Sequence, residues 1–252
     1  MSGHSKWSQI KRQKGVTDTR RGADFTKAAN AITITARQAG GNPESNFKLR
    51  LAIEAARKLN MPKDNIERAI SRGTGAGKEG LNLEEVTYEG YGPAGVAVLV
   101  ETVTDNRQRT AQDVRGAFER LGGNISGPSS VTHLFAPIGE ITVKIKAGSN
   151  PDDLLLLAAD AGASDVETDS NEAIIYCAAS ELDKVKNYLA AKDLEVVEAK
   201  LSRKSVTNVK IEDESKAAAI LSLVNKLDDL PDVQKVYANF DIPDEILKKV
   251  VA

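Results

Sequence analysis

Residues 140–178, EITVKIKAGSNPDDLLLLAADAGASDVETDSNEAIIYCA, decide the fold class. A strand pattern at 140–145 is followed by a helical pattern at 150–161 and by two strand patterns at 163–169 and 172–178. A helix at 180–191 and a strand at 194–200 complete the order βαββαβ, which is that of ferredoxin-like domains. We therefore predict a ferredoxin-like domain over residues 138–200.

The sequence on either side of this unit predicts a second α/β domain, which the unit interrupts. Strand 95–103, helix 107–121 and strand 131–136 come before it, and segment 201–208, helix 213–229 and strand 233–240 come after it. We predict one split domain, residues 81–137 plus 201–252, with 138–200 inserted. A simple linear series of α/β pieces is the alternative that these patterns leave open.

The N-terminal third predicts helices instead of strands. An apolar stripe over 22–39, a second over 45–59 and a third that opens at Pro62 and ends at Gly73 predict a small bundle. The glycine-rich stretch GTGAGKEG at 73–80 predicts a linker. The expected organisation is a basic arm at 1–21, a helical domain and linker at 22–80, and the two α/β domains. The fold class is α+β: an N-terminal helical bundle followed by two ferredoxin-like α/β domains, one inserted into the other.

Charge is divided unevenly along the chain. Residues 1–80 hold 16 Lys and Arg against 7 Asp and Glu, whereas the remainder holds 18 against 29. Cations bind phosphate by releasing condensed counterions, so we expect residues 1–72 to contact nucleic acid. The 138–200 unit holds 6 basic against 13 acidic residues, and Tyr176 is the one aromatic on its predicted central strands, so we expect no RNA-recognition surface there. Mutual attraction between the basic and acidic parts is the alternative explanation of the asymmetry.

The sequence holds few residues suited to catalysis or metal binding. One cysteine and two histidines cannot supply the clustered ligands of a zinc site, and Cys177 lies in an apolar strand that predicts burial. The Gly77-Lys78 pair lacks the spacing and the following Ser or Thr of a phosphate-binding loop. We expect a non-enzymatic protein without cofactor or metal. With no apolar run long enough for a membrane span and no signal peptide, we expect a cytoplasmic protein. We also expect a monomer, although the sequence carries no feature that settles oligomeric state.

Candidate phosphate contacts are the cations of the arm, of the outward helix faces and of the segment TDNRQRT at 104–110. They are Lys6, Lys11, Arg12, Lys14, Arg20, Arg21, Lys27, Arg37, Arg68, Arg72, Arg107 and Arg109. Arg107 and Arg109 stand at a predicted helix start, where exposed N–H groups could help them to hold an anion. Trp7 could stack on a base or anchor the arm as an apolar residue, and both interpretations stay open.

Four motifs in this order closely resemble the YebC/PmpR family over nearly the whole chain. They are GHSKW at 3–7, NMPKDNIERAI at 60–70, YEGYGP at 88–93 and TDNRQRT at 104–110. The resemblance implies a helical domain followed by two α/β domains, and no enzymatic activity. Family members are described as DNA-binding transcriptional regulators or as translation factors that act at the ribosome, including on stalled proline-rich stretches. A mitochondrial relative is a translational activator of a cytochrome oxidase subunit. Lys6, Trp7, Arg107 and Arg109 carry over as motif positions.

The chain departs from the family pattern in two places. The segment 125–131, ISGPSSV, lacks the expected glycines and contains Pro128, so any role that needs a flexible loop there is in doubt. The arm reads KRQK at 11–14 where the family has a histidine, but its positive charge is kept.

The sequence thus favours a translation factor that contacts ribosomal or messenger RNA through residues 1–72. A DNA-binding transcriptional regulator is the alternative, and a protein-interaction scaffold with an incidental basic arm is the second alternative.

Overall fold

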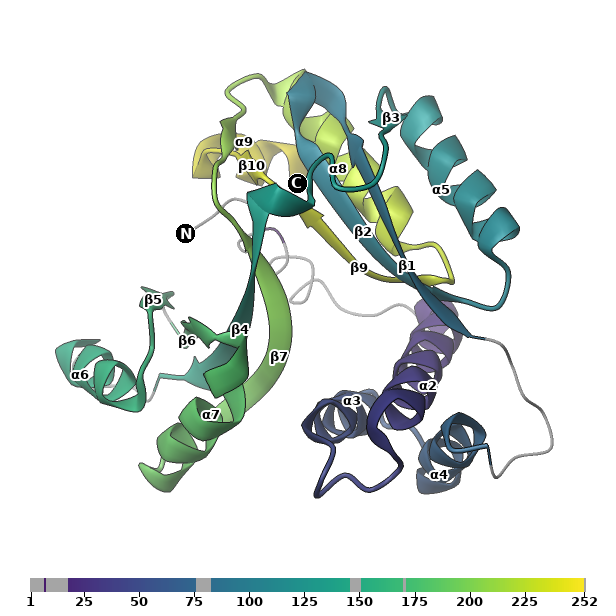
Figure 1. Cartoon of the computed structure of the whole chain (residues 1–252). Helices are drawn as coiled ribbons and strands as arrows, with labels where there is room; N and C mark the ends of the chain where they lie inside the picture. The colour runs from purple at the N-terminus through teal and green to yellow at the C-terminus, as the bar shows by residue number, and fades with distance from the viewer. Residues whose placement is uncertain (1–6, 8–17, 76–82, 146–150, 170, 252) are drawn as a thin grey trace. The chain divides into compact units, whose positions relative to one another are not determined.

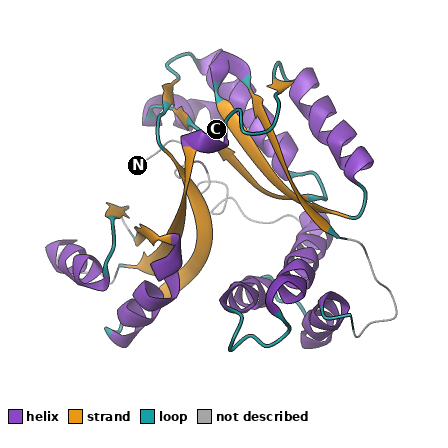
Figure 2. Cartoon of the chain, in the orientation of Figure 1, coloured by secondary structure: helices purple, strands orange, loops and turns teal. Residues whose placement is uncertain are grey.

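A computed structural model describes residue 7 and residues 18–75, 83–145, 151–169 and 171–251 (Figure 1). The chain divides into two compact units. One comprises residues 1–134 and 205–252, and the other comprises residues 135–204. The elements described between residues 18 and 75 are helices, and from residue 84 onward strands and helices are interspersed. Figure 2 shows these helices and strands in the orientation of Figure 1. The α+β fold class expected from the sequence is confirmed.

Three helices, α2 (Asp18–Ala39), α3 (Phe47–Lys58) and α4 (Lys63–Gly73), form the helical domain. The side chain of Asn46 caps α3 by accepting a hydrogen bond from the backbone N–H of Leu49, at 3.1 Å. Helix α2 begins at Asp18, four residues before the predicted start, because a polar first turn carries no apolar periodicity that a sequence pattern could detect.

Helices α2 and α4 approach each other closely at Gly73. A Cβ atom added there would lie only 2.3 Å from the carbonyl oxygen of Thr33, and the Thr33 hydroxyl donates to the carbonyl of Ala69 at 3.1 Å. The shared core of the bundle is built from one apolar stripe of each helix and from the turn between α3 and α4. Its buried members are Ile32, Ala36, Leu49, Ile53, Ala56, Met61, Ile66 and Ala69.

The split domain is built around a four-stranded antiparallel sheet of order β3-β1-β2-β9. Before the insertion come β1 (Glu84–Tyr91), β2 (Ala97–Thr104), α5 (Arg107–Arg120) and β3 (Asn124–Ile125). After it come β8 (Val209–Lys210), α8 (Glu214–Asp228), β9 (Val233–Ala238), β10 (Phe240–Asp241) and α9 (Asp244–Val251). Valines of β2 and β9 pack against α5, α8 and α9 in one apolar core.

The sheet of this domain contains a β-hairpin, β1–β2, that the sequence patterns did not predict. β1 and β2 pair from Glu84 opposite Thr104 to Tyr91 opposite Ala97. The predicted strand 131–136 is instead the short 3₁₀ turn Thr132–Leu134, which leads into the next strand. Gly90 is needed in β1 because an added Cβ would lie 2.8 Å from the ring of Phe118.

The inserted unit contains β4 (Phe135–Lys144), α6 (Pro151–Ala161), β5 (Asp165–Thr168), β6 (Glu172–Ala178), α7 (Leu182–Ala191) and β7 (Val196–Ser205). Its sheet order, β5-β6-β4-β7, and its βαββαβ chain order are those of a ferredoxin-like domain. The chain leaves and re-enters the split domain at one place, where Val206 N–H donates to the Leu134 carbonyl at 2.8 Å. Cys177 is fully buried, as predicted.

Within the described ranges, no helix is both long enough and apolar enough to cross a membrane.

Candidate nucleic-acid interface

Exposed cations lie on α3 and α4 of the helical domain. Lys48, Arg57 and Lys58 of α3 are exposed, as is Arg68 of α4, whereas Arg72 is half-buried. The Arg68 side chain donates from Nε to the Asp64 carbonyl at 3.2 Å and from Nη2 to the side chain of Asn65. These contacts hold Arg68 along its own helix and leave the side chain exposed to solvent.

Two side chains of α2 that were predicted to contact phosphate instead donate to backbone carbonyl groups of the split domain. Arg37 Nη1 donates to the Leu83 carbonyl at 3.2 Å, and Lys27 Nζ donates to the Asp228 carbonyl. Leu83, which accepts from Arg37, belongs to an apolar cluster with Ile34 and Val103. Lys27 and Arg37 therefore tie α2 to the split domain, which accounts for both side chains without nucleic acid.

The predicted arm is only partly within the described residues. Lys6, Lys11, Arg12 and Lys14 lie outside them, and Arg20 and Arg21 fall in the first turn of α2. Their role in binding stays a prediction.

Trp7 is partly buried and packs against the apolar core of the split domain. Its indole Nε1 is buried and has no hydrogen-bond partner among the described residues. An indole that stacks on a base needs an exposed ring face. The geometry favours the anchor interpretation over the stacking interpretation. The apolar core that Trp7 contacts belongs to the split domain and not to the helical domain.

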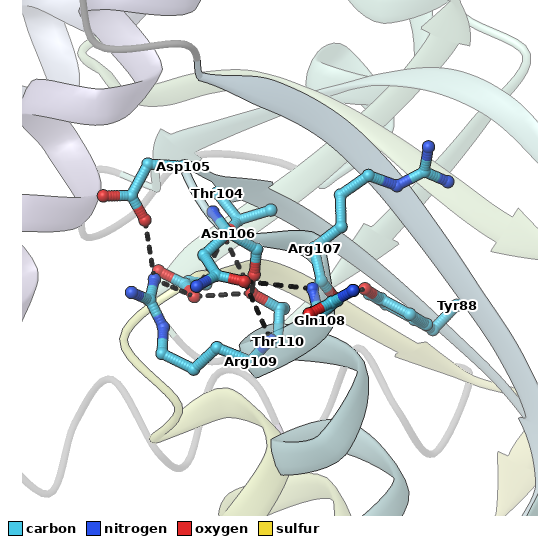
Figure 3. A network of polar contacts seen from close by, with 9 residues as sticks. Tyr88, Thr104, Asp105, Asn106, Arg107, Gln108, Arg109 and Thr110 are labelled. Carbon is cyan, nitrogen blue, oxygen red and sulfur yellow. Dashed lines mark hydrogen bonds and ion pairs between the residues drawn. The ribbon is translucent and has the colours of Figure 1, made fainter.

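The TDNRQRT segment forms the end of β2 and the start of α5 (Figure 3). Asn106 caps the helix: its Oδ1 accepts from the backbone N–H groups of Gln108 and Arg109, both at 3.1 Å. These N–H groups were expected to help bind an anion. They are already satisfied within the chain, so the helix start lacks two of the donors that the expected site requires.

Arg109 belongs to a polar network around Asp232, a nearly buried residue that precedes β9. Arg109 Nη2 lies 2.7 Å from Asp232 Oδ2 and 2.8 Å from Asp105 Oδ1. Thr110 Oγ1 lies 2.6 Å from the same Asp232 oxygen and 2.8 Å from Thr104 Oγ1. The hydrogen bonds to Asp232 and Asp105, with burial opposing them, raise the pKa of Arg109. Two carboxylates offset this guanidinium charge, so Arg109 joins the starts of α5 and β9 instead of offering a free cation.

Arg107 is the more exposed of the two arginines. Its side chain is 67% exposed, and its Nε lies 3.9 Å from Glu84 Oε2, a separation that gives little net attraction at a solvated surface. Figure 3 shows Arg107 and Arg109 pointing to opposite sides of the helix start. The Tyr88 hydroxyl donates to the Arg107 carbonyl at 3.3 Å, and burial raises the pKa of Tyr88. Arg107 is therefore the motif arginine best placed to meet a phosphate.

A buried carboxylate that the sequence patterns did not single out organises the loop after β3. Glu89 Oε1 accepts from Ser129 N–H at 2.7 Å, and Oε2 accepts from Val131 and Thr132 N–H at 2.7 and 2.8 Å. Burial alone raises the pKa of Glu89, but the Val131, Ser129 and Thr132 hydrogen bonds outweigh it and the net pKa is lowered. The loop is fixed by Glu89, and the only sequence signal for this was the position of Glu89 within YEGYGP.

The sheet of the inserted domain does not offer aromatic rings for stacking. Tyr176 is 2% exposed, its hydroxyl donates to Glu167 Oε2 at 2.8 Å, and Lys204 Nζ lies 4.2 Å from the ring centroid. The sequence predicts no RNA-recognition surface on this domain, and the burial of Tyr176 is consistent with that prediction.

Over the described part of the chain, no three His, Cys, Asp or Glu side chains come together as a metal site requires.

Fold and site together define a multidomain α+β protein that exposes cations on a helical domain and carries two α/β domains. Family models describe the same parts. Residues 5–76 match the TACO1/YebC N-terminal domain, and residues 83–240 match the TACO1/YebC second and third domains. The chain belongs to the TACO1/YebC family, which confirms the resemblance found in its motifs.

Similar proteins extend over the full length of the chain. A protein of Syntrophus aciditrophicus is 47% identical over 252 residues, covering 100% of both chains, and one of Chloroflexus aurantiacus is 49% identical over 251 residues, covering 99% of both. Both are named "Probable transcriptional regulatory protein". A crystal structure of a conserved hypothetical protein from Aquifex aeolicus is 44% identical, covers 91% of this chain and 94% of its own, and superposes with a TM-score of 0.83.

Proposed function

We propose that this chain is a non-enzymatic regulator of gene expression that binds nucleic acid through its helical domain and acts as an RNA- and ribosome-associated translation factor. The observation that carries the proposal is the placement of exposed cations. Lys48, Arg57 and Lys58 of α3 and Arg68 of α4 lie exposed in the segment that holds 16 basic against 7 acidic residues. Such a surface binds the phosphate backbone through charge, whatever the sequence of the bases.

A DNA-binding transcriptional regulator is the second candidate, and the printed names of the relatives favour it. The outer face of α4 does not help this candidate. Its first turn carries Asp64, and Lys63 pairs with Glu67 at 3.4 Å, whereas a recognition helix presents donors to base edges. The RNA proposal therefore comes first.

Cosedimentation with ribosomes across a salt series tests the proposal. The variant that carries Lys48→Glu, Arg57→Glu and Lys58→Glu should lose binding, and in the wild type the logarithm of the binding constant should fall linearly with the logarithm of salt concentration. A variant with Lys144→Glu, Lys184→Glu and Lys192→Glu in the inserted domain changes net charge equally and is the matched control. It should bind like the wild type if the contact is local to the helical domain.

The competing candidates give different results in this experiment. A protein that stays off ribosomes but shifts a promoter fragment is a transcriptional regulator. A chain whose biological activity survives the helical-domain charge reversal is a protein-interaction scaffold.

A further inference from the structure

Helix α6 of the inserted domain exposes two adjacent large apolar side chains. Leu155 is 44% exposed and Leu156 is 66% exposed, and only Val206 is comparable among the large apolar residues of the described chain. Single exposed leucines are ordinary, but two on one helical face form an apolar patch whose exposure to water is unfavourable.

The opposite face of α6 accounts for the stability of the helix without this pair. Leu154, Ala158 and Ala161, spaced four and three residues apart, are buried in the domain. At 100° per residue, Leu155 and Leu156 therefore lie on the outward side together with exposed Ala159. The two leucines contribute little to folding and remain available to a partner.

The surroundings of the pair are acidic. Asp152 and Asp153 in the first turn of α6 and Asp160 in its last turn are exposed, and α6 contains no Lys or Arg. The domain as a whole holds 6 basic against 13 acidic residues over 138–200. An apolar centre with an acidic rim repels nucleic acid and anionic lipid, and it complements a basic protein segment that brings an apolar side chain.

We propose that the outer face of α6, Asp152, Asp153, Leu155, Leu156, Ala159 and Asp160, is a docking surface for a basic protein segment. Two leucines bury far less area than a stable dimer needs, so the contact is a small and transient one, steered by charge. This proposal goes beyond nucleic-acid binding by the helical domain and holds whether the chain acts on RNA or on DNA.

Site-specific photocrosslinking in living cells tests it. Leu156 is replaced by p-benzoylphenylalanine in the full chain, and crosslinked products are identified by mass spectrometry. The same replacement at Val206, which is also 66% exposed, is the matched control because it has the same apolar exposure but is not part of α6. We expect position 156, and not position 206, to crosslink to a protein whose crosslinked segment is rich in Lys and Arg.

A second variant links the crosslink to the acidic rim. Asp152→Asn, Asp153→Asn and Asp160→Asn, made together with the photocrosslinker, should lower the yield about tenfold because steering charge is lost. Circular dichroism of the purified variant checks that α6 still forms. The proposal is overturned if position 156 crosslinks no more than position 206, or if the product is RNA, lipid or a second copy of this chain. It is also overturned if the three Asp→Asn substitutions leave the crosslinking yield unchanged. Because the readout does not depend on ribosome binding, failure of the proposed function leaves this result interpretable.

Discussion

Replacing Glu89 by Gln should loosen the loop after β3 and cost about 2–4 kcal/mol of folding free energy. The carboxylate accepts three backbone N–H groups, from Ser129, Val131 and Thr132, at 2.7 to 2.8 Å. A net hydrogen bond to a charged group is worth about 1.5–3 kcal/mol, and a neutral one about 1 kcal/mol. The amide oxygen of Gln can keep the two donors that share one oxygen, but its NH₂ group then faces Ser129 N–H and leaves that donor unsatisfied.

The effect should depend on pH in a defined direction. The pKa of Glu89 is lowered from its ordinary value of 4.5, so the carboxylate stabilises the fold at pH above 4.5. That stabilisation is lost as pH falls through the lowered pKa. The difference in unfolding free energy between wild type and Glu89→Gln should therefore be constant near neutral pH and shrink below 4.5.

Two measurements check this prediction. Urea unfolding at several pH values gives the free-energy difference, and hydrogen exchange of the Ser129, Val131 and Thr132 amides reads the bonds directly. Glu84→Gln on the same strand is the control, because its loose and exposed contact with Arg107 at 3.9 Å should be worth less than about 1 kcal/mol. Unchanged protection of the three amides, or a difference that does not vary with pH, would refute the assignment of Glu89 as the loop anchor.

Three further predictions concern a close helix approach, the Trp7 contact and the Asp232 network. Gly73→Ala should cost about 1–3 kcal/mol of unfolding free energy in urea, because its Cβ would lie 2.3 Å from the Thr33 carbonyl oxygen. Gly22→Ala, with open space around it, should instead stabilise α2 by roughly 0.5–1 kcal/mol. Equal effects of the two substitutions would contradict the close approach of α2 and α4 at Gly73. Trp7→Ala should destabilise the fold by about 2 kcal/mol, and Trp7→Phe by much less, because the side chain packs against the core of the split domain. The fluorescence emission of this single tryptophan should be unchanged when RNA is added, and quenching by RNA would favour stacking instead. Asp232→Ala should cost about 1–3 kcal/mol by removing the acceptor that Arg109 and Thr110 share, although Arg109 keeps Asp105 and Thr110 keeps Thr104 as partners. A thermal midpoint like that of the wild type would exclude Asp232 as a source of stability.

The inserted domain could be predicted because its elements carry strong local signals. The apolar run of β6, AIIYC, and the Pro151-Asp152-Asp153 start of α6 each favour one local structure. The hairpin strand β1 carries no such signal. Its burial begins only near Glu89 and Gly90, and glycine ordinarily marks a turn, so a pattern of apolar residues cannot find a strand that exists by pairing with β2.

The sites were harder to predict for a different reason. Arg109 and Asp232 are 123 positions apart, and Lys27 and Asp228 are 201 apart, so no spacing rule relates them. A positive charge in a sequence shows that a side chain can bind phosphate but not that it is available to do so. Lys27, Arg37 and Arg109 have partners within the chain that only the fold reveals.

The two arginines of TDNRQRT differ in their surroundings, one held in a polar network and the other exposed. Arg109 lies on the side of the helix start that faces Asp232, and its bonds fix where α5 begins. Because that start is fixed, Arg107, two residues earlier and thus on the other side of the helix, is held outward with its backbone carbonyl bonded by Tyr88. The exposed arginine depends on the buried network for its position. Changing Arg109 should therefore weaken any phosphate contact at Arg107 indirectly, through disorder of the helix start, whereas Arg107→Ala should weaken it without changing stability.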